Sequence, residues 1–328
     1  MPLFQKLSQL FFWGFEGTTL SPQIKKLFKS CPPAGMILFK RNIESLEQVK
    51  KFNHSLQKLV SHKIFIGVDQ EGGRVGRLPL PFPQYPPAAT WGKFFDGGKN
   101  KGLVFEAGYF LGTELRRFGF NINFVPVLDV NSNPKNPIIG DRSFSRDPKI
   151  AAQAAIAFYQ GMKKAGIVAC GKHFPGHGDT NQDSHLTLPH VKKNRESLKK
   201  TELFPFQKAI KARIPMLMTA HVIYSALDPK NPATLSKKIL TELLRKEMKF
   251  QGVLISDDLE MKAVSKKYTS EESALLSLEA GVDLILICRG GEDGDRIVQK
   301  VFQEVQKSPV LKKRIDESYQ RVTSLLGS

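Results

Sequence analysis

The sequence predicts an α/β fold, a single-domain (β/α)8 TIM barrel, and three observations support this prediction. Short runs of β-branched and aromatic residues alternate about eight times with longer segments of helical spacing. These runs are apolar at nearly every position, which is typical of parallel strands covered by helices. The early glycine cluster EGGRVGR, at 71–77, lacks the G-x-G-x-x-G spacing of an open dinucleotide-binding sheet. The repeat count therefore favours a closed barrel over an open, doubly wound sheet.

The expected elements follow one another from the amino terminus onward. The segment LSQLFFWGF is interpreted as the first strand and not as a signal peptide, because no small-residue cleavage pattern follows it. Ser21-Pro22 and Asp147-Pro148 have the N-cap and first-turn chemistry that starts a helix. The expected strands are 9–14, 35–39, 64–69, 122–129, 167–171, 215–221, 252–257 and 283–288. The expected helices are 21–30, 44–61, 103–118, 148–165, 195–212, 236–249 and 271–280, with a C-terminal pair after residue 293.

The domain organisation follows from the absence of breaks in this pattern. The 328 residues show no internal repeat, low-complexity tract or long Ser/Gly linker. The proline-rich stretch PLPFPQYPP, at 79–87, is too short for a domain linker and is interpreted as a rigid surface loop. We therefore expect residues 1–328 to form one domain.

Composition and charge narrow the classes of function. Hydrophobic residues make up 41% of the chain and charged residues 24%, as in globular proteins. The net charge of +18 comes from lysine doublets scattered over the whole length. A nucleic-acid site instead gathers its cations on one face or arm. No stretch approaches the roughly 18 uninterrupted apolar residues of a membrane span. We therefore expect neither nucleic-acid binding nor membrane insertion.

The three cysteines indicate a cellular compartment. Cys31, Cys170 and Cys288 lie far apart and form no C-x-x-C motif. This spacing disfavours a disulfide framework or a zinc ribbon, and it suits the reducing cytoplasm. We expect a cytoplasmic protein.

Polar side chains collect where the expected strands end. In a barrel of this class, chemistry takes place on the loops at the carboxyl ends of the strands. The polar residues at such ends are Asp69, Asp129, Lys172, His173, His221, Asp257 and Asp258. So many titratable side chains converging on one rim are hard to explain by folding needs alone, and they predict an active site there.

The histidine-rich stretch KHFPGHGDTNQDSHLTLP, at 172–189, could serve a metal or a proton transfer. His173 and His177 are four residues apart, but the proline and glycines among them prevent the helix that a zinc-protease motif needs. For His177 and Asp179 we favour a structural role within the loop. The metal alternative stays open as a metal-dependent barrel hydrolase with ligands drawn from His173, His185, His221 and Asp257.

Proton transfer is the second possibility for this stretch. Asp183 lies two residues before His185, so its carboxylate can accept one ring N–H and leave the other nitrogen to move a proton. Asp257 and Asp258 supply carboxylates at a strand end, although one of them could only cap the following helix. A fixed carboxylate together with a mobile acid/base is what a two-step, retaining glycoside cleavage requires.

Four motifs, in this order, resemble those of glycoside hydrolase family 3. They are GVDQEGGRVGRL (67–78), IGDRSFSRDP (139–148), KHFPGHGDTNQDSHLTLP (172–189) and GVLISDDLEM (252–261). The stronger similarity is to the family's single-domain β-N-acetylglucosaminidases, the NagZ-type enzymes of bacterial cell-wall recycling. Many family members carry a carboxylate acid/base on a second domain, and a chain of 328 residues leaves no room for one. The proton donor is then expected on a loop of the barrel.

The resemblance implies roles for individual residues. It makes Asp257 the nucleophile, His185 the acid/base and Asp183 its partner. It assigns sugar binding to Asp69, Arg77, Arg142, Lys172 and His173. It implies a retaining exo-hydrolase that acts on terminal β-linked N-acetylglucosamine, without a metal or other cofactor.

The substrate and partners follow from the same resemblance. It suggests a small muropeptide or disaccharide substrate that ends in anhydro-muramic acid or its peptides, and we expect a monomer. A histidine acid/base carries one negative charge fewer than a carboxylate, so phosphate could replace water as the acceptor. A phosphorylase is therefore a further alternative, and we favour hydrolysis.

Overall fold

The computed structural model describes residues 1–95, 98–182 and 188–327, and its strands form a parallel barrel. The sheet order is β10-β1-β2-β3-β4-β5-β7-β9, with every neighbouring pair parallel. A parallel bridge between Ile255 and Leu284 joins the β9 edge to the chain entering β10, which closes the ring. The strands are β1 (Phe11–Trp13), β2 (Gly35–Leu38), β3 (Phe65–Val68), β4 (Ile122–Asn123), β5 (Val168–Phe174), β7 (Met216–Thr219), β9 (Val253–Ile255) and β10 (Ile285–Ile287). The predicted (β/α)8 barrel is confirmed.

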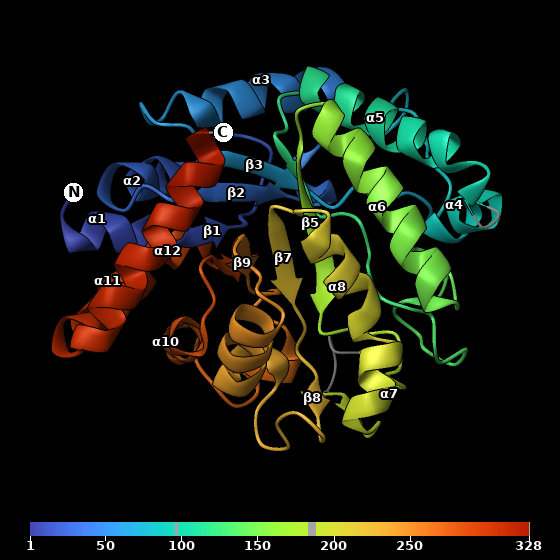
Figure 1. Ribbon diagram of the computed structural model, residues 1–328. Helices are drawn as coiled ribbons and strands as arrows, with labels where there is room; N and C mark the ends of the chain where they lie inside the picture. The colour runs from blue at the N-terminus through green and yellow to red at the C-terminus, as the bar shows by residue number, and fades with distance from the viewer. Residues whose placement is uncertain (96–97, 183–187, 328) are drawn as a thin grey trace.

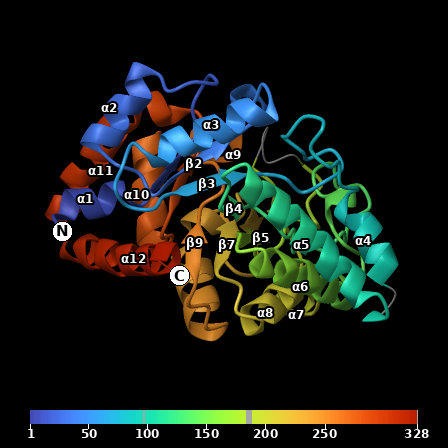
Figure 2. The ribbon, with the colours of Figure 1, turned by 90° about the horizontal axis from the view of Figure 1, so that it is seen from above.

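Helices surround the strands on the outside, as Figures 1 and 2 show. The α-helices are α1 (Leu3–Ser8), α2 (Pro22–Ser30), α3 (Leu46–Gln57), α4 (Ala88–Phe95), α5 (Lys101–Arg117), α6 (Pro148–Lys164), α7 (Arg195–Lys200), α8 (Leu203–Lys211), α9 (Lys262–Ser265), α10 (Ser270–Ala280), α11 (Gly294–Lys307) and α12 (Pro309–Gly327). A π-helix, η5 (Lys238–Glu247), lies between β7 and β9. Short 3-10 turns include η3 (Gly140–Arg142) and η4 (Ala233–Leu235), and β6 (His190–Val191) pairs with β8 (Ile223–Tyr224).

The predicted helix starts are confirmed where a capping side chain precedes a proline. The Ser21 hydroxyl accepts a hydrogen bond from the Ile24 amide, 3.2 Å away, at the start of α2. Asp147 does the same for α6, with its Oδ1 2.7 Å from the Lys149 amide. Each cap satisfies amide groups that the first helical turn leaves unpaired.

Two expected elements differ from the structure for identifiable reasons, and one helix was not expected. The strand expected over 122–129 is only two residues long, because Pro126 has no amide hydrogen to donate to a neighbouring strand. The helix expected over 195–212 breaks at Thr201–Glu202, since the ring of Pro205 would clash with the carbonyl of residue 201 in a continuous helix. The loop expected at 79–87 is confirmed, but α4 follows it and was not predicted.

The amino terminus also departs from the expected single strand. Residues 3–8 form α1, and only Phe11–Trp13 pair in the barrel. Within the residues that the structure describes, none of the helices has both the length and the apolar character that a membrane crossing needs.

Aromatic side chains fill the barrel interior. Phe12, on β1, lies 5.6 Å from Phe124 and 6.2 Å from Phe65 between ring centroids. Gly35, on β2, makes room for it, because a Cβ there would lie 2.7 Å from the Phe12 ring. These fully buried rings pack inside the barrel, below its polar end.

A close contact between α5 and α6 gives a test of the packing. At Gly108, on α5, an added Cβ would lie 2.2 Å from the Phe158 carbonyl oxygen. Gly108→Ala is expected to lower the free energy of unfolding by about 1–3 kcal/mol, because the helices must separate. Gly102, on the same helix, has no neighbour within 4 Å of an added Cβ, so Gly102→Ala is the matched control. Urea denaturation would contradict this packing if both variants had the wild-type midpoint.

Candidate active site

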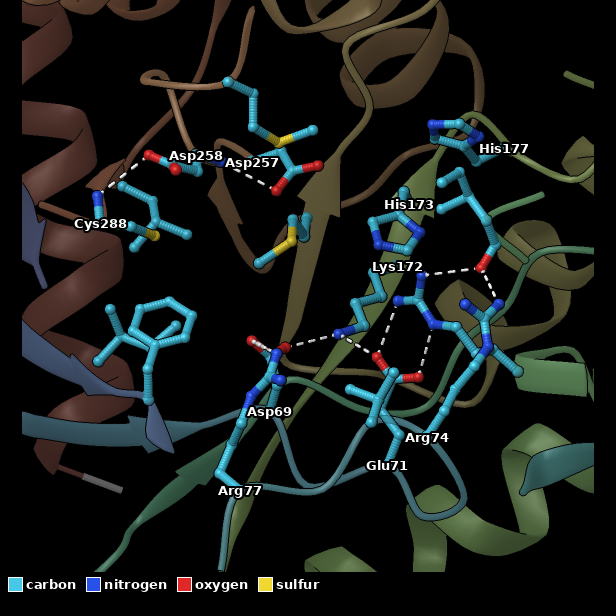
Figure 3. A pocket seen from close by; sticks show the side chains of 18 of the residues that line it. Asp69, Glu71, Arg74, Arg77, Lys172, His173, His177, Asp257, Asp258 and Cys288 are labelled. Carbon is cyan, nitrogen blue, oxygen red and sulfur yellow. Dashed lines mark hydrogen bonds and ion pairs between the residues drawn. The ribbon is translucent and has the colours of Figure 1, made fainter. Parts of the chain in front are cut away.

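A cavity of about 560 Å³ opens at the carboxyl ends of the barrel strands, and Figure 3 shows its side chains. Its walls come from the ends of β2, β3, β5, β7, β9 and β10 and from the loop that contains η3. The sequence-predicted residues that line it are Asp69, Arg77, Arg142, Lys172, His173 and Asp257. The structure therefore brings together in one cavity residues that lie up to 188 positions apart in the chain, from Asp69 to Asp257.

A network of buried charges forms one side of this cavity. The Lys172 ammonium lies 2.7 Å from Asp69 Oδ1 and 2.6 Å from Glu71 Oε1. The guanidinium of Arg142 donates two hydrogen bonds to Glu71, at 2.8 and 2.9 Å. Figure 3 shows Lys172 between the two carboxylates and Asp257 across the cavity from them. Two cations and two anions thus neutralise one another away from water.

The pairing sets the ionisation of these groups. Burial by itself would raise the pKa of the Glu71 carboxyl, but the charges of Arg142 and Lys172 outweigh it and hold that pKa well below its usual range. Burial would likewise lower the pKa of Lys172, yet Asp69 and Glu71 raise it above the ordinary value. Glu71 and Lys172 therefore carry their charges at neutral pH.

Arg77 and His173 complete the predicted sugar-binding set. The Arg77 guanidinium lies 3.6 Å from Asp69 Oδ2 and 5.6 Å from the centre of the Phe39 ring. His173 is held by Asp129, whose Oδ2 is 2.6 Å from Nδ1 of the imidazole. Because a carboxylate accepts from Nδ1, the opposite nitrogen, Nε2, is the one left for a ligand.

Asp129 is fully buried and acts as an anchor for the histidine loop. Its Oδ1 also accepts from the His177 backbone amide, at 2.6 Å. Burial raises the pKa of this carboxyl, but His173 and His177 outweigh burial and lower it. The His177 ring lies 2.9 Å from the Thr180 hydroxyl, and burial, aided by His173, lowers its pKa to about 4. His177 is therefore neutral at pH 7.

His177 and Asp179, for which the sequence favours a structural role in the loop, each contact another residue. Asp179 pairs with Lys193, 2.9 Å away, whereas His177 bonds to Thr180. His177 also lines the cavity, so it is both a loop element and a wall of the site.

The two carboxylates after β9 have different environments. Asp258 Oδ1 accepts from the amides of Cys288 and Glu260, at 3.0 and 3.1 Å, and burial raises the pKa of Asp258. Both residues are half-buried, and Asp257 Oδ1 accepts from the Asp258 amide at 2.9 Å. Asp258 is thus the carboxylate that ties the following turn to β10, a distinction that the sequence could not make.

His221 does not belong to the cavity wall. It is fully buried, with Nδ1 2.8 Å from the Thr234 hydroxyl and Nε2 2.8 Å from the Asp258 carbonyl. Both ring nitrogens are therefore engaged, which disfavours His221 as the metal ligand of the alternative considered above. Across the described ranges, no three His, Cys, Asp or Glu side chains are grouped so that they could hold a metal ion. Asp183 and His185 lie outside the described residues.

Sequence reasoning missed Glu71 and the part played by Asp129. Glu71 lies two residues after Asp69 in the same strand-end motif, and this position was the available signal. Arg41, Arg74 and Arg289, which also line the cavity, were not singled out either. Nothing in their local sequence distinguishes them from other basic residues.

Replacing Glu71 tests the buried charge network. Glu71→Gln leaves Lys172 and Arg142 with one carboxylate fewer, so the free energy of unfolding at pH 7 is expected to fall by about 3 kcal/mol or more. The Glu71 pKa is lower in the folded state, so its contribution is present above the unfolded-state pKa of about 4.3 and is lost as the pH falls through the folded-state value. Urea denaturation at pH 7 and pH 3 should therefore show a smaller difference between variant and wild type at pH 3.

The matched control for this test is an exposed glutamate. Glu196→Gln removes one partner of a surface pair with Lys200, and a change below about 0.5 kcal/mol is expected. Equal denaturation midpoints for Glu71→Gln and Glu196→Gln at pH 7 would show that the buried network does not stabilise the fold.

Comparison with known proteins identifies relatives of this chain. The model of the glycosyl hydrolase family 3 N-terminal domain matches residues 3–325. A β-hexosaminidase from Nitrosomonas eutropha is 38% identical over 290 residues, which cover 88% of this chain and 83% of the relative.

Solved structures give the same result. A family 3 β-N-acetylglucosaminidase from Paenibacillus has a TM-score of 0.94 at 39% identity, over 99% of this chain but only 62% of that chain. NagZ from Neisseria gonorrhoeae, in complex with N-trifluoroacetyl-D-glucosamine, has a TM-score of 0.80 at 31% identity, over 97% of this chain and 94% of that one. The chain therefore belongs to glycoside hydrolase family 3, among relatives that include the bacterial β-hexosaminidases.

Proposed function

We propose that this chain is a retaining exo-β-N-acetylglucosaminidase that releases terminal N-acetylglucosamine from peptidoglycan fragments during cell-wall recycling. The observation that carries the proposal is the cavity in which Asp257 faces a network of paired charges formed by Asp69, Glu71, Lys172 and Arg142. The similarity to a β-hexosaminidase, to a family 3 β-N-acetylglucosaminidase and to NagZ in complex with N-trifluoroacetyl-D-glucosamine supports the choice of sugar.

Asp257 is the proposed nucleophile. The carboxylate of Asp258 is occupied by two backbone amides, and its raised pKa disfavours the anionic form. Asp257 lines the cavity, and the Asp258 amide donates to its Oδ1 at 2.9 Å. Its oxygen would attack the anomeric carbon and form a covalent glycosyl-enzyme intermediate.

His185 is the proposed acid/base and Asp183 its partner. His185 would protonate the departing glycosidic oxygen in the first step and deprotonate the attacking water in the second. The Asp183 carboxylate would fix the tautomer of the ring and stabilise its protonated form. No metal or other cofactor takes part in these steps.

The sugar hydroxyls are proposed to contact Asp69, Arg77, Arg142, Lys172 and His173. Charged donors and acceptors form stronger hydrogen bonds with hydroxyl groups than neutral ones do. Their mutual pairing holds each side chain in place before the sugar arrives, so little ordering is left for the binding step.

An anionic leaving group is proposed because of the basic residues at the cavity. Arg41, Arg74 and Arg289 also line it. Arg41 pairs with Glu16 and Arg74 with Asp141, and Arg289 is exposed. Anhydro-muramic acid and its peptides carry carboxylates that such guanidinium groups would attract. We further propose that residues 1–328 act as one catalytic domain, as a monomer in the cytoplasm, where the free thiols of its three buried cysteines stay reduced.

Release of nitrophenol from 4-nitrophenyl N-acetyl-β-D-glucosaminide tests the activity and the nucleophile together. The wild type should cleave it with or without a chelator, and Asp257→Asn should lower kcat on the order of a thousandfold or more. Asp316→Asn removes a carboxylate on α12 that pairs with Lys6, and it should leave kcat unchanged.

The products of the same reaction separate the alternatives. Free N-acetylglucosamine of β configuration as the first product supports retention and hydrolysis. A sugar 1-phosphate that forms when inorganic phosphate is added would identify a phosphorylase. Cleavage that a chelator abolishes would identify a metal-dependent hydrolase and contradict the proposal.

Arg289→Ala tests the anionic leaving group. The variant is expected to lower kcat/KM about threefold to fivefold for an N-acetylglucosaminyl-anhydro-muramyl peptide, because it loses one exposed ionic contact. The neutral substrate 4-nitrophenyl N-acetyl-β-D-glucosaminide should show no such loss. Lys312→Ala removes the same charge from α12, remote from the cavity, and should affect neither substrate. An equal loss on both substrates would show that Arg289 does not recognise the leaving group.

A further inference from the structure

Two threonines and one histidine connect the two ends of the Asp257–Asp258 dipeptide. The Asp257 amide lies 3.3 Å from the Thr219 hydroxyl, which lies 2.8 Å from the Thr234 hydroxyl. Thr234 lies 2.8 Å from Nδ1 of His221, and Nε2 of the same ring lies 2.8 Å from the Asp258 carbonyl. The chain of contacts therefore starts at the first amide of the dipeptide and returns to its last carbonyl.

The three side chains belong to a rigid part of the barrel. Thr219 is the last residue of β7, and Thr234 lies in η4, which follows that strand. All three side chains are fully buried. The backbone of η4 is tied to the segment after β7, because the Ala233 amide donates to the Val222 carbonyl at 2.9 Å. The contacts therefore link the β9 loop to its neighbouring strand and not to solvent.

The carbonyl at one end of this chain, together with a neutral His221 ring, sets the direction of every hydrogen bond in it. A carbonyl only accepts, so Nε2 of His221 must carry a proton. In the neutral ring Nδ1 then accepts, and the Thr234 hydroxyl donates to it. Thr219 must donate in turn to Thr234, which leaves the Thr219 oxygen to accept from the Asp257 amide.

The Thr234 hydroxyl has a second possible acceptor, so the direction of its hydrogen bond depends on whether the His221 ring is charged. The Thr234 hydroxyl also lies 3.1 Å from the Ala220 carbonyl. If the Thr234 hydroxyl donated to the Ala220 carbonyl, Nδ1 of His221 would have to donate to Thr234. With Nε2 also protonated, the ring would then be a buried cation. Its direct partners are a hydroxyl and a carbonyl, neither of which compensates a buried charge. These contacts fit a ring with its proton on Nε2 and an accepting Nδ1.

We propose that His221, Thr234 and Thr219 position the nucleophile by holding the Asp257–Asp258 dipeptide at both ends. The link to the reacting atoms is the Asp258 amide, which donates to Asp257 Oδ1 at 2.9 Å. Fixing the dipeptide fixes this donor, and the donor orients the carboxylate. The proposal rests on the proposed role of Asp257, and His221 acts as a positioning residue without touching the sugar.

Two substitutions of His221 separate its two hydrogen bonds. The amide of Gln reaches the place of Nε2 and can still donate to the Asp258 carbonyl, whereas the amide of Asn reaches only the place of Nδ1. His221→Asn is expected to lower kcat for 4-nitrophenyl N-acetyl-β-D-glucosaminide about tenfold to hundredfold, because a misplacement near 1 Å has effects of this size. KM and the affinity for N-acetylglucosamine should stay within about twofold of the wild type, and His221→Gln should recover most of kcat.

The outcomes distinguish positioning from a purely structural role. Wild-type kcat in His221→Asn would overturn the proposal. So would an equal loss of kcat and thermal stability in the Asn and Gln variants, because only the Gln variant keeps the bond to Asp258. If His221→Asn does not fold, Thr234→Val and Thr234→Ser replace the pair. A lower kcat in Thr234→Val, with kcat near the wild-type value in Thr234→Ser, supports the chain of hydrogen bonds. A wild-type kcat in Thr234→Val overturns it.

A spectroscopic measurement keeps this test independent of the activity. In ¹⁵N-labelled protein, the imidazole signal that is missing from His221→Gln should show the neutral form protonated on Nε2 at pH 7. A signal for the Nδ1-protonated or doubly protonated ring would contradict the hydrogen-bond directions. If the wild type releases no nitrophenol, the proposed function fails, and this signal still decides whether the bond chain exists.

Discussion

Charges removed from water must be paired, and this constraint organises the mouth of the barrel. Lys172 and Glu71 are buried, so each needs an opposite charge within hydrogen-bond distance. Asp69 and Arg142 supply the remaining partners, and the buried carboxylate of Asp129 lies 2.6 Å from Nδ1 of His173. The result is a set of polar groups whose positions are fixed in the absence of a ligand. A pocket built in this way can orient a sugar without first having to order its own side chains.

The closed parallel barrel makes such pairing possible. The carboxyl ends of its strands meet in one ring, so residues distant in sequence can share one network. Aromatic packing around Phe12 fills the interior below this ring. On the opposite side of the cavity the β9 loop carries Asp257, and its support comes from β7 and η4. The residues proposed to bind the sugar and the proposed nucleophile are therefore held by different parts of one rigid frame.

The sequence predicted the barrel well because alternating apolar runs and helical segments depend on local periodicity. It was less accurate where one residue changed the local geometry, as at Pro126, which shortens β4, and Pro205, which separates α7 from α8. In the site, the family motifs identified Asp69, Lys172 and Asp257, which do line one cavity. They did not identify Glu71, the buried partner of two cations, although it lies two residues after Asp69, because its burial depends on Lys172 and Arg142, which are distant in the sequence.

The sequence by itself determined the fold class, the order of the elements and the strand ends at which chemistry would be found. Only the tertiary structure decided which polar group faces which. His221 stands at a strand end like His173, yet its ring is buried between Thr234 and the Asp258 carbonyl. Asp258 is adjacent to Asp257, yet its carboxylate is bound by two amides. Periodicity depends on neighbours along the chain, whereas burial and pairing depend on groups that meet only when the barrel closes.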